Sequence, residues 1–363
     1  MSDHIPFEIQ TEIIKYLPVK SLIQFRSVSK PWKSLIDSSE FIVNYHVNHS
    51  QLQHHLLVRF SLIVPTSVKQ LGRLPLMLGT SQGLLSFYNN SVPSYEHKTM
   101  TIVIWNPTIV KSVSVVVPNV FQIYPFDTVV GFGVCPQTMD PMLVKITYSS
   151  SYEYNTVSIP FQVEIFTLIS RVWRSSSNNL PRRSLTMTRD QVSIDRFIYW
   201  LACDRIRKTE GVGYYLTNSI LSFDMISEEF ADIYLPDSLA QLSDSNLCIG
   251  NLRTSLVVLE INREVEKREY YVWRMENGAP NSFVKLFVIK APDASFIKKI
   301  NGVLGFRKTG KPIIDVLYDT DERKNGLFVY ELESEQINDI GVNGVGFPYL
   351  AYSYMETLLL LNH

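Results

Sequence analysis

This chain of 363 residues has neither an excess of one sign of charge nor a long hydrophobic run, and each absence excludes a class of protein. The 34 lysine and arginine residues nearly balance the 35 aspartate and glutamate residues, so the net charge of −1 offers no electrostatic footprint for nucleic acid or an anionic membrane. No apolar run reaches the roughly 18 residues of a membrane-spanning helix. We therefore expect neither a nucleic-acid nor a membrane partner.

Cysteine is also scarce, and no secretory leader is visible. Cys135, Cys203 and Cys248 are odd in number and far apart, which is typical of a reducing compartment rather than of a disulfide framework. They lack the C-x-x-C spacing of structural zinc and dithiol sites. The N-terminus has no basic segment followed by an apolar one. These features predict a soluble intracellular protein, located in the cytoplasm, the nucleus or both.

Two patterns could indicate chemistry, but each lacks its partners. Residues 79–83 (Gly-Thr-Ser-Gln-Gly) match the G-x-S-x-G nucleophile elbow, which needs a helix after the serine, whereas strand-like sequence follows here. Only His97 and His363 remain downstream of that serine as a general base. Four histidines between 46 and 55 have spacings that could bind zinc, but no nearby cysteine or carboxylate completes a ligand set. We expect a turn and a solvated connector, and no catalytic residue, metal or cofactor.

The first 46 residues have the periodicity of three short helices. Pro6 suits the first turn of a helix, and apolar residues follow at helical spacing until Pro18 ends the run. A second apolar run follows, and Ser29 is suited to cap a third helix that carries Trp32. Residues 40–45 continue as a short helix. A unit this small buries little apolar surface by itself, so its surplus apolar residues predict a docking partner.

The order of residues in this segment resembles the plant F-box. The matching positions are Ile5, Pro6, Glu8, Ile13, Ile14, Leu17, Pro18, Val19, Lys20, Ser21, Leu22, Phe25, Arg26, Val28, Ser29, Lys30, Trp32, Leu35, Ile36 and Phe41. The resemblance implies docking on a Skp1-type adaptor and, through it, on cullin and RING subunits. The residues assigned to adaptor binding are Pro6, Ile9, Ile13, Ile14, Leu17, Pro18, Leu22, Phe25, Val28, Trp32, Leu35 and Ile36. The alternative is an unrelated helical cap.

Beyond a polar connector at 47–55, the domain at 56–363 is predicted to be all-β, because short β-branched and aromatic runs alternate with turn residues. One strand type carries an aromatic residue every 50 to 60 residues or so, close to the period of β-propeller blades. These aromatic residues, which we expect to pack in the core, are Trp105, Phe166, Phe223, Trp273 and Tyr330. Four-stranded units fit 84–118, 129–181, 197–236, 247–289 and 303–342.

The two leftover segments, 56–78 and 346–361, are expected to pair and close the ring, because closure removes exposed sheet edges. The fold class is therefore multidomain α + β: a small three-helix F-box followed by a six-bladed propeller, with seven blades as the alternative count. The runner-up architecture is a large open or sandwiched antiparallel sheet. The chain lacks the Gly-Gly doublet of kelch blades and the Trp-Asp dipeptide of WD40 blades.

A second resemblance supports the propeller. Residues 83–86 (Gly-Leu-Leu-Ser), 105–107 (Trp-Asn-Pro), 131–133 (Gly-Phe-Gly) and 220–236 are similar to the F-box-associated interaction domain of plant proteins. Together the two resemblances imply a non-catalytic substrate-recognition subunit of an SCF-type (Skp1–cullin–F-box) E3 ubiquitin ligase, whose β domain binds an unidentified target protein. The alternatives are a propeller enzyme or glycan-binding lectin with an F-box, and an F-box protein that sequesters its partner without degrading it.

The target is expected on the long loops between the second and third strands of each unit, because long loops cost little stability and sit on a rigid scaffold. These loops are 89–98, 149–155, 205–213, 262–269 and 319–326. The candidate substrate-binding residues are Arg205, Arg207, Lys208, Asp319, Asp321 and Arg323. The alternative is the opposite face, to which we assign the connections between units, such as 175–183 and 291–296.

Overall fold

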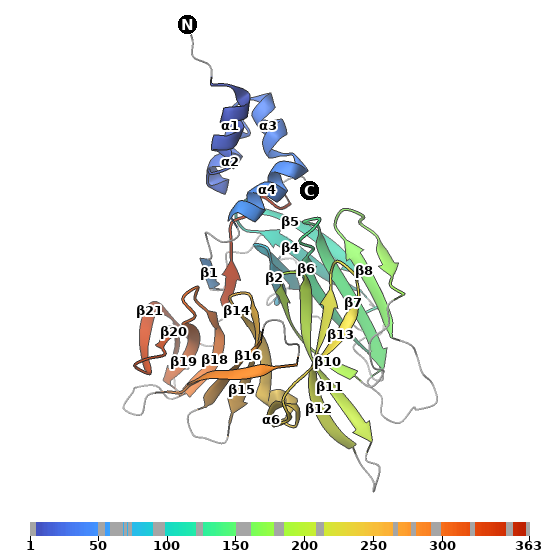
Figure 1. Ribbon diagram of the computed structural model, residues 1–363, viewed down its shortest axis with the longest axis vertical. Coiled ribbons are helices and arrows are strands. Elements are labelled where there is room, and N and C mark those ends of the chain that lie inside the picture. Colours follow the sequence, from blue (N-terminus) through green and yellow to red (C-terminus); the bar gives the residue numbers. More distant parts are fainter. Residues whose placement is uncertain are drawn as a thin grey trace.

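The chain folds into four helices standing on one end of a ring of β-sheets, as seen in a computed structural model (Figure 1). The structure describes residues 5–49, 55–58, 68, 71, 75–89, 99–120, 126–149, 161–177, 185–207, 214–263, 268–276, 281–291, 299–319, 324–345 and 351–360. Within these ranges, none of the helices has the length and hydropathy needed to cross a membrane.

The helical module, residues 5–49, comprises α1 (Phe7–Ile14), α2 (Val19–Phe25), α3 (Lys30–Ile36) and α4 (Ser39–His49). The predicted start signals are confirmed. Pro6 and Pro18 occupy the N-caps of α1 and α2, and Ser29 Oγ accepts a hydrogen bond of 3.2 Å from the backbone N–H of Trp32. The helix predicted at 40–45 runs from Ser39 to His49, so the part of the expected connector at 47–49 is helical.

The β domain contains five antiparallel four-stranded blades, each with its strands paired in sequence order. Blade 1 is β2 (Leu76–Ser81), β3 (Leu84–Tyr88), β4 (Met100–Asn106) and β5 (Lys111–Val117). Blade 2 is β6 (Phe126–Val134), β7 (Pro141–Ser149), β8 (Gln162–Thr167) and β9 (Trp173–Ser175). Blade 3 is β10 (Leu185–Ile194), β11 (Phe197–Arg207), β12 (Tyr214–Asp224) and β13 (Phe230–Tyr234).

Blade 4 is β14 (Leu247–Leu252), β15 (Ser255–Asn262), β16 (Glu269–Met275) and β17 (Phe283–Ile289). Blade 5 is β18 (Lys299–Phe306), β19 (Pro312–Asp319), β20 (Lys324–Glu331) and β21 (Gln336–Val345). Between blades 3 and 4 lie α6 (Asp237–Ala240) and the short helix η1 (Asp244–Asn246).

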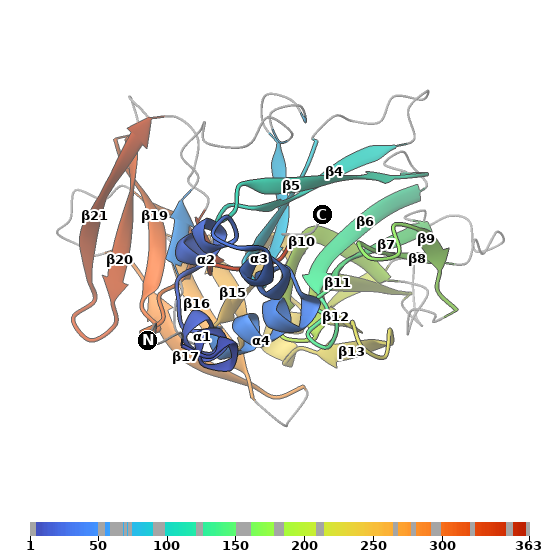
Figure 2. The same ribbon diagram turned by 90° about the horizontal axis from the view of Figure 1, so that it is seen from above.

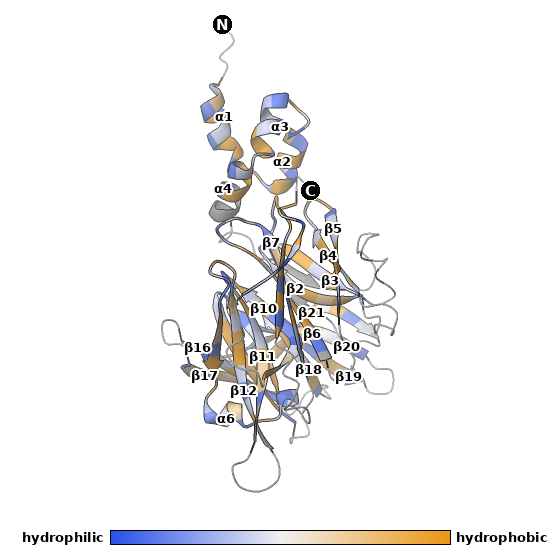
Figure 3. Cartoon of the chain, turned by 90° about the vertical axis from the view of Figure 1, so that its right-hand side faces the viewer, coloured by the Kyte–Doolittle hydropathy of each residue, from blue (hydrophilic) through white to orange (hydrophobic). Residues whose placement is uncertain are grey.

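The predicted aromatic repeat is confirmed as a feature of the third strand. Its five residues lie on β4, β8, β12, β16 and β20, which are the third strands of blades 1 to 5. Four of these side chains are buried, whereas Trp273 is half-buried and donates its indole N–H to Glu260 Oε2 at 2.9 Å. Figure 3, which colours the chain by hydropathy, shows stretches of apolar residues along the strands. Core packing, rather than a ligand site, explains the repeat.

The first strands of the blades contact one another in turn, and the ring closes through a two-stranded sheet. In that sheet β1 (His55–Val58) pairs antiparallel with β22 (Ala351–Tyr354), which in turn contacts both β18 and β2. The predicted pairing of the two ends of the β domain is therefore confirmed.

The predicted count of six or seven blades is wrong. The described residues form five four-stranded blades, and two strands of four residues each occupy the closing position. So short a sheet suffices because closure requires only an inner strand that touches both neighbours. The predicted units also omitted the first strands of blades 1 and 3. Residues 76–78, which we expected in the closing pair, belong to β2, and β10 precedes the unit predicted at 197–236.

Connections between strands alternate between the two ends of the ring, because every blade is antiparallel in sequence order. Turns from first to second and from third to fourth strands lie at the end that carries the helical module, here called the proximal face (Figure 1). Loops from second to third strands, and connections between blades, lie at the other end, the distal face. Residues 175–177 and 291 follow the fourth strands of blades 2 and 4, which end at the distal face, so these parts do not lie opposite the long loops as expected. Residues 178–183 and 292–296 lie outside the described residues.

One cluster of buried side chains is continuous from the helical module into the propeller. It includes Ile14, Val19, Leu22, Ile36, Phe41 and Tyr45 of the module, Leu358, Leu359 and Leu360 near the C-terminus, and Leu84, Ile104, Phe132 and Leu143 of blades 1 and 2. Viewed from above, the helices lie over the ring with the blades arranged around them (Figure 2). The module and the propeller therefore share a core rather than meeting through a free linker.

Candidate protein-docking sites

A row of apolar side chains lies exposed along α1. Ile9 and Ile13 are one helical turn apart on α1, Ile5 precedes the helix and Tyr16 follows it, and the four side chains are 52% (Ile5), 51% (Ile9), 51% (Ile13) and 76% (Tyr16) exposed. We call this row the α1 stripe. Large apolar residues of a small helical unit are normally turned inward, so a continuous exposed row indicates a surface for another protein.

The twelve residues predicted to bind an adaptor fall into three groups. Ile14, Leu22 and Ile36 are at most 2% exposed and pack inside the module, so they stabilise it and offer no surface to a partner. Leu17, Phe25, Trp32 and Leu35 are half-buried. Pro6, Ile9, Ile13, Pro18 and Val28 are exposed. Adaptor contact by the half-buried and exposed residues stays a prediction.

The sequence-based assignment missed three exposed apolar residues of the module, namely Ile5, Phe7 and Tyr16. The spacing of residues 5, 9, 13 and 16 could have indicated two of them, Ile5 and Tyr16. Ile5 and Tyr16 lie just before and just after α1, at the two ends of the row formed with Ile9 and Ile13.

Polar contacts hold the helices of the module in place. The Tyr45 hydroxyl on α4 donates to the carbonyl oxygen of Leu17 at 2.8 Å, and burial raises the pKa of Tyr45 to about 12, so this donor keeps its proton. Arg26 binds both carboxylate oxygens of Asp37, at 2.5 and 2.9 Å. The indole N–H of Trp32 on α3 donates to Gln10 Oε1 on α1 at 2.9 Å. The exposed row is thus presented on a braced scaffold.

The candidate substrate-binding residues lie at the distal face as far as the structure describes them. Arg205 and Arg207 are in the last residues of β11, Asp319 is the last residue of β19, and both strands end there. Lys208, Asp321 and Arg323 lie outside the described residues. The strands on either side of each predicted long loop are the second and third strands of a blade, so the loops start and finish at the same end of the ring, although most of their residues lie outside the described ones. Substrate binding by these residues stays a prediction.

The G-x-S-x-G segment forms no nucleophile elbow. Ser81 ends β2, and Gln82 and Gly83, both with positive φ, form the tight turn into β3 rather than the start of a helix. Ser81 Oγ accepts a hydrogen bond of 3.0 Å from the backbone N–H of Val134 and lies 3.2 Å from Ser193 Oγ. The serine therefore joins the first strands of three blades. His54, one of the four candidate zinc ligands, lies outside the described residues.

Comparison with protein families matches residues 2–44 to the F-box domain and residues 32–363 to the F-box associated beta propeller domain. The second match covers most of the chain. Among individual relatives, the Arabidopsis thaliana protein named putative F-box protein At5g50220 is 26% identical over 279 residues, which are 75% of this chain and 66% of that protein. The chain thus spans just under two thirds of that relative.

The Arabidopsis thaliana F-box protein CPR1 is 21% identical over 395 aligned positions, which cover 98% of this chain and 89% of that protein. Among solved structures, an acylaminoacyl peptidase from Pyrococcus horikoshii aligns with 76% of this chain and 47% of its own chain, at 12% identity and a TM-score of 0.40. A likeness at that score carries no argument about function.

Proposed function

The chain belongs to the family of F-box proteins with an F-box associated β-propeller domain, and from this premise we propose that it is the substrate-recognition subunit of an SCF-type E3 ubiquitin ligase. The F-box, residues 5–49, binds a Skp1-type adaptor, which links it to cullin and RING subunits. The propeller binds a target protein at its distal face. The chain itself performs no covalent chemistry.

The observation that carries this proposal is the α1 stripe. Four apolar side chains, each about half exposed or more, lie on α1 or directly beside its ends, in the module that the family match identifies as an F-box. Leu17, Pro18 and Val28 extend the apolar surface beyond that helix. Burying such a row against a partner gains about 25 cal/mol per Å² of apolar surface. The adaptor is the partner that this domain implies.

Ubiquitin transfer in this arrangement depends on proximity. A receptor that holds the target near the charged conjugating enzyme raises the effective concentration of the target lysine, without contributing a reacting group. The two docking surfaces lie at opposite ends of the molecule, which leaves the distal face open while the F-box is occupied (Figure 1).

The test is adaptor capture by a variant with Ile9→Asp and Ile13→Asp. Placing two carboxylates in the α1 stripe should abolish capture, because a buried unpaired charge is costly. The matched control is Ile169→Asp with Val172→Asp, two apolar residues of the propeller that are 69% and 61% exposed. The control should capture adaptor normally. Equal capture by both variants would contradict the proposal.

A second measurement separates degradation from sequestration. The half-life of a captured target should lengthen when the α1-stripe variant replaces the normal protein, because the target is then bound but not ubiquitinated. An unchanged half-life would favour a binding protein that does not promote degradation. Replacing the loops at 208–213 and 320–323 with Gly-Ser segments should reduce target capture and leave adaptor capture intact.

A further inference from the structure

Two aromatic side chains on the third strand of blade 4 hold an ammonium group over their ring faces. Tyr271 and Trp273 are two residues apart on β16, so their side chains lie on the same face of the sheet. The Nζ atom of Lys285, on the neighbouring strand β17, is 3.8 Å from the centre of the Tyr271 ring and 5.5 Å from the centre of the Trp273 ring. Both distances are those of cation–π contacts.

Two carboxylates fix these rings and make their surroundings negative. The indole N–H of Trp273 donates to Glu260 Oε2 at 2.9 Å, and the hydroxyl of Tyr271 donates to Glu269 Oε2 at 2.9 Å. The bond to Glu269 raises the pKa of Tyr271, so the phenol stays neutral near neutral pH. We call these four side chains the blade 4 box. One ammonium does not balance two carboxylates, so the box keeps an excess of negative charge and favours cations.

The rings of the box are not closed into the core. Among the five repeated aromatic residues of the third strands, Trp273 is half-buried, whereas the other four are at most 8% exposed. Tyr271 is also half-buried, and Lys285 is exposed. Partly open aromatic rings with polar ends that are already bonded are typical of surfaces that contact other molecules. Blade 4 therefore departs from the packing of the other blades at this position.

The ammonium that occupies the box can be replaced. Within the described part of the chain, Lys285 forms no ion pair, and its recorded contacts are those with the two rings. A cation–π contact at an exposed site is weak, and a lysine side chain is a flexible four-carbon stem. When that stem turns away, it leaves a position of the size and polarity that a second ammonium group requires. No further cavity is needed.

The box adjoins the face on which we place the target. Glu269 is the first residue of β16 and Asn262 the last of β15, so these two residues bound the predicted long loop at 262–269. Both form hydrogen bonds with the hydroxyl of Tyr271. A segment that lies on this distal loop can therefore reach the rings.

We propose that the blade 4 box receives a lysine side chain of the target protein, whose ammonium group takes the place of that of Lys285. The inference rests on the proposed role as a substrate receptor, because it names the chemistry by which that receptor holds its target. The tethered Lys285 competes for the same position, so a target segment needs further contacts on the distal face to displace it.

The test uses the purified full chain labelled with fluorotryptophan and the five-residue peptide acetyl-Gly-Gly-Lys-Gly-Gly-amide, titrated in the millimolar range. The fluorine resonance of Trp273, assigned by its loss in Trp273→Phe, should shift as the peptide binds. The same peptide with norleucine in place of lysine keeps the apolar stem and lacks the charge, so it should not produce this shift. Versions with arginine and with trimethyllysine measure the preference among cations.

Removing the competing ammonium should strengthen binding. Lys285→Met keeps an apolar stem and should increase the affinity for the lysine peptide about three- to sixfold, because the box is then always free. Lys290→Met is the matched control, since Lys290 is 47% exposed, follows β17 and pairs with Glu335 outside the box. Glu260→Gln with Glu269→Gln keeps the hydrogen-bond acceptors and removes both charges, so it should weaken binding about fivefold or more.

Equal shifts with the lysine and norleucine peptides would overturn the inference. Equal affinities of Lys285→Met and Lys290→Met, or a preference for the arginine or trimethyllysine peptide, would also overturn it. Adaptor capture, measured on the same preparations, keeps the two proposals separate. Lysine-selective binding without adaptor capture would refute the ligase role alone, whereas adaptor capture without lysine-selective binding would refute the box alone.

Discussion

At the residue scale, Gly131 and Gly133 of the Gly-Phe-Gly segment are required because side chains of blade 3 approach their Cα atoms closely. A Cβ on Gly131 would lie 2.2 Å from Cζ2 of Trp200, and a Cβ on Gly133 would lie 2.5 Å from the sulfur of Met225. Trp200 is fully buried, so its rigid ring cannot withdraw. Both glycines lie on β6, the first strand of blade 2, and they let it pack tightly against side chains of blade 3.

Gly131→Ala should therefore destabilise the protein by about 1–3 kcal/mol, the range of an overpacked core. The matched control is Gly302→Ala, because a Cβ on Gly302 would meet no atom within 4 Å. The control should change stability by about 0.5 kcal/mol or less. Urea unfolding of both variants measures the difference. Equal midpoints would show that blade 2 can move away from Trp200.

Asn106, in the Trp-Asn-Pro motif, ties the end of the chain to blade 1. Its buried side-chain amide donates to the carbonyl oxygens of Thr357 and Leu359 at 2.9 and 2.7 Å, while its oxygen accepts from the N–H of Thr108 at 2.9 Å. An amide is needed here because the site requires donors and an acceptor from one small group.

Asn106→Asp should lower the free energy of unfolding by about 3 kcal/mol, because a carboxylate would face two carbonyl oxygens without donating to them. Asn119→Asp is the control, since Asn119 is exposed. Thermal unfolding at neutral pH checks both variants. If Asn106→Asp melts like the control, the contact to the C-terminal segment does not contribute to stability.

At the element scale, the blades are joined by side chains that cross between strands of different sheets. Gln191 on β10 donates to the carbonyl oxygen of Leu78 on β2 at 3.2 Å and accepts from the N–H of Phe132 on β6 at 3.3 Å. On the outer side, the buried Lys145 pairs with Glu164 and donates to the carbonyl oxygen of Pro118 at 2.9 Å. Neighbouring blades are separate sheets without backbone hydrogen bonds between them in the described residues, so these side-chain contacts join them instead.

Substitutions in the turn between α1 and α2 test the F-box role at the element scale. Leu17→Ala with Pro18→Ala should abolish adaptor capture and leave the propeller folded, because Leu17 buries an apolar side chain worth about 1.5–3 kcal/mol and Pro18 fixes the start of α2. Pull-down of adaptor, with melting of the same preparation, measures both effects. Leu332→Ala, an exposed apolar residue of the propeller, is the control. Capture at the normal level by the double variant would contradict the F-box role.

At the scale of the whole molecule, the shared core fixes the F-box relative to the propeller. Leu358, Leu359 and Leu360 belong to the same buried cluster as Ile36 and Tyr45 of the module. Just before them in the chain, β22 closes the ring of blades. One C-terminal stretch thus closes the propeller and packs against the helices of the F-box.

Deleting residues 346–363 should consequently cause aggregation and a lower melting temperature. The deletion removes β22, which exposes edges of the ring, and it removes the apolar base of the module. Size-exclusion chromatography with light scattering and thermal unfolding measure the outcome. Removing only residues 361–363, which leaves β22 and Leu360 in place, is the control. A monomeric long truncation with an unchanged melting temperature would mean that the ring does not need this closure.

The sequence by itself determined the features that depend on local patterns. Pro6, apolar residues at helical spacing and Ser29 predicted α1, α2 and α3. Short β-branched and aromatic runs between turn residues predicted the strands, and a recurring aromatic residue marked one strand of each blade. The helical spacing of Ile9 and Ile13 also predicted part of the exposed apolar row, but not Ile5 and Tyr16. These signals are local, because capping, pleating and helical spacing act over a few residues.

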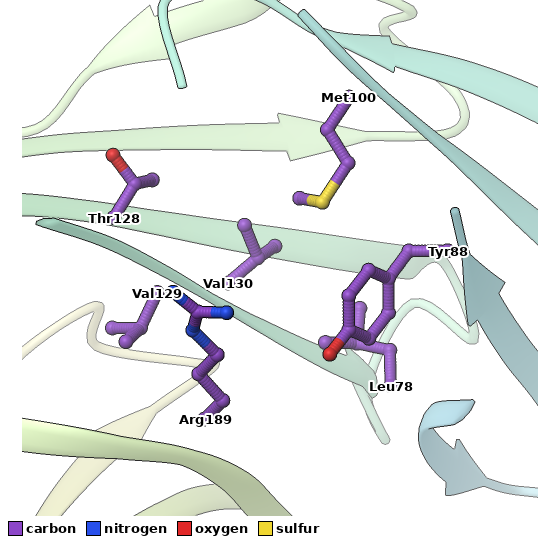
Figure 4. Close-up of a pocket in the computed structure, with 7 residues that line it drawn as sticks. All are labelled: Leu78, Tyr88, Met100, Thr128, Val129, Val130 and Arg189. Atoms are coloured by element: carbon purple, nitrogen blue, oxygen red, sulfur yellow. The ribbon is translucent and has the colours of Figure 1, made fainter. Parts of the chain in front are cut away.

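Only the tertiary structure decided the number of complete blades, the burial of Ile14, Leu22 and Ile36, and the role of the C-terminal segment. The first strands of blades 1 and 3 escaped prediction because they face the centre of the ring, where Ser81 and Gln191 bond to other blades and break the apolar pattern. A small cavity lined by Leu78, Val130 and Arg189, among others, takes its walls from strands of three blades (Figure 4). Contacts between residues more than 100 positions apart, such as Gln191 with Leu78, depend on how the blades pack and leave no local signal in the chain.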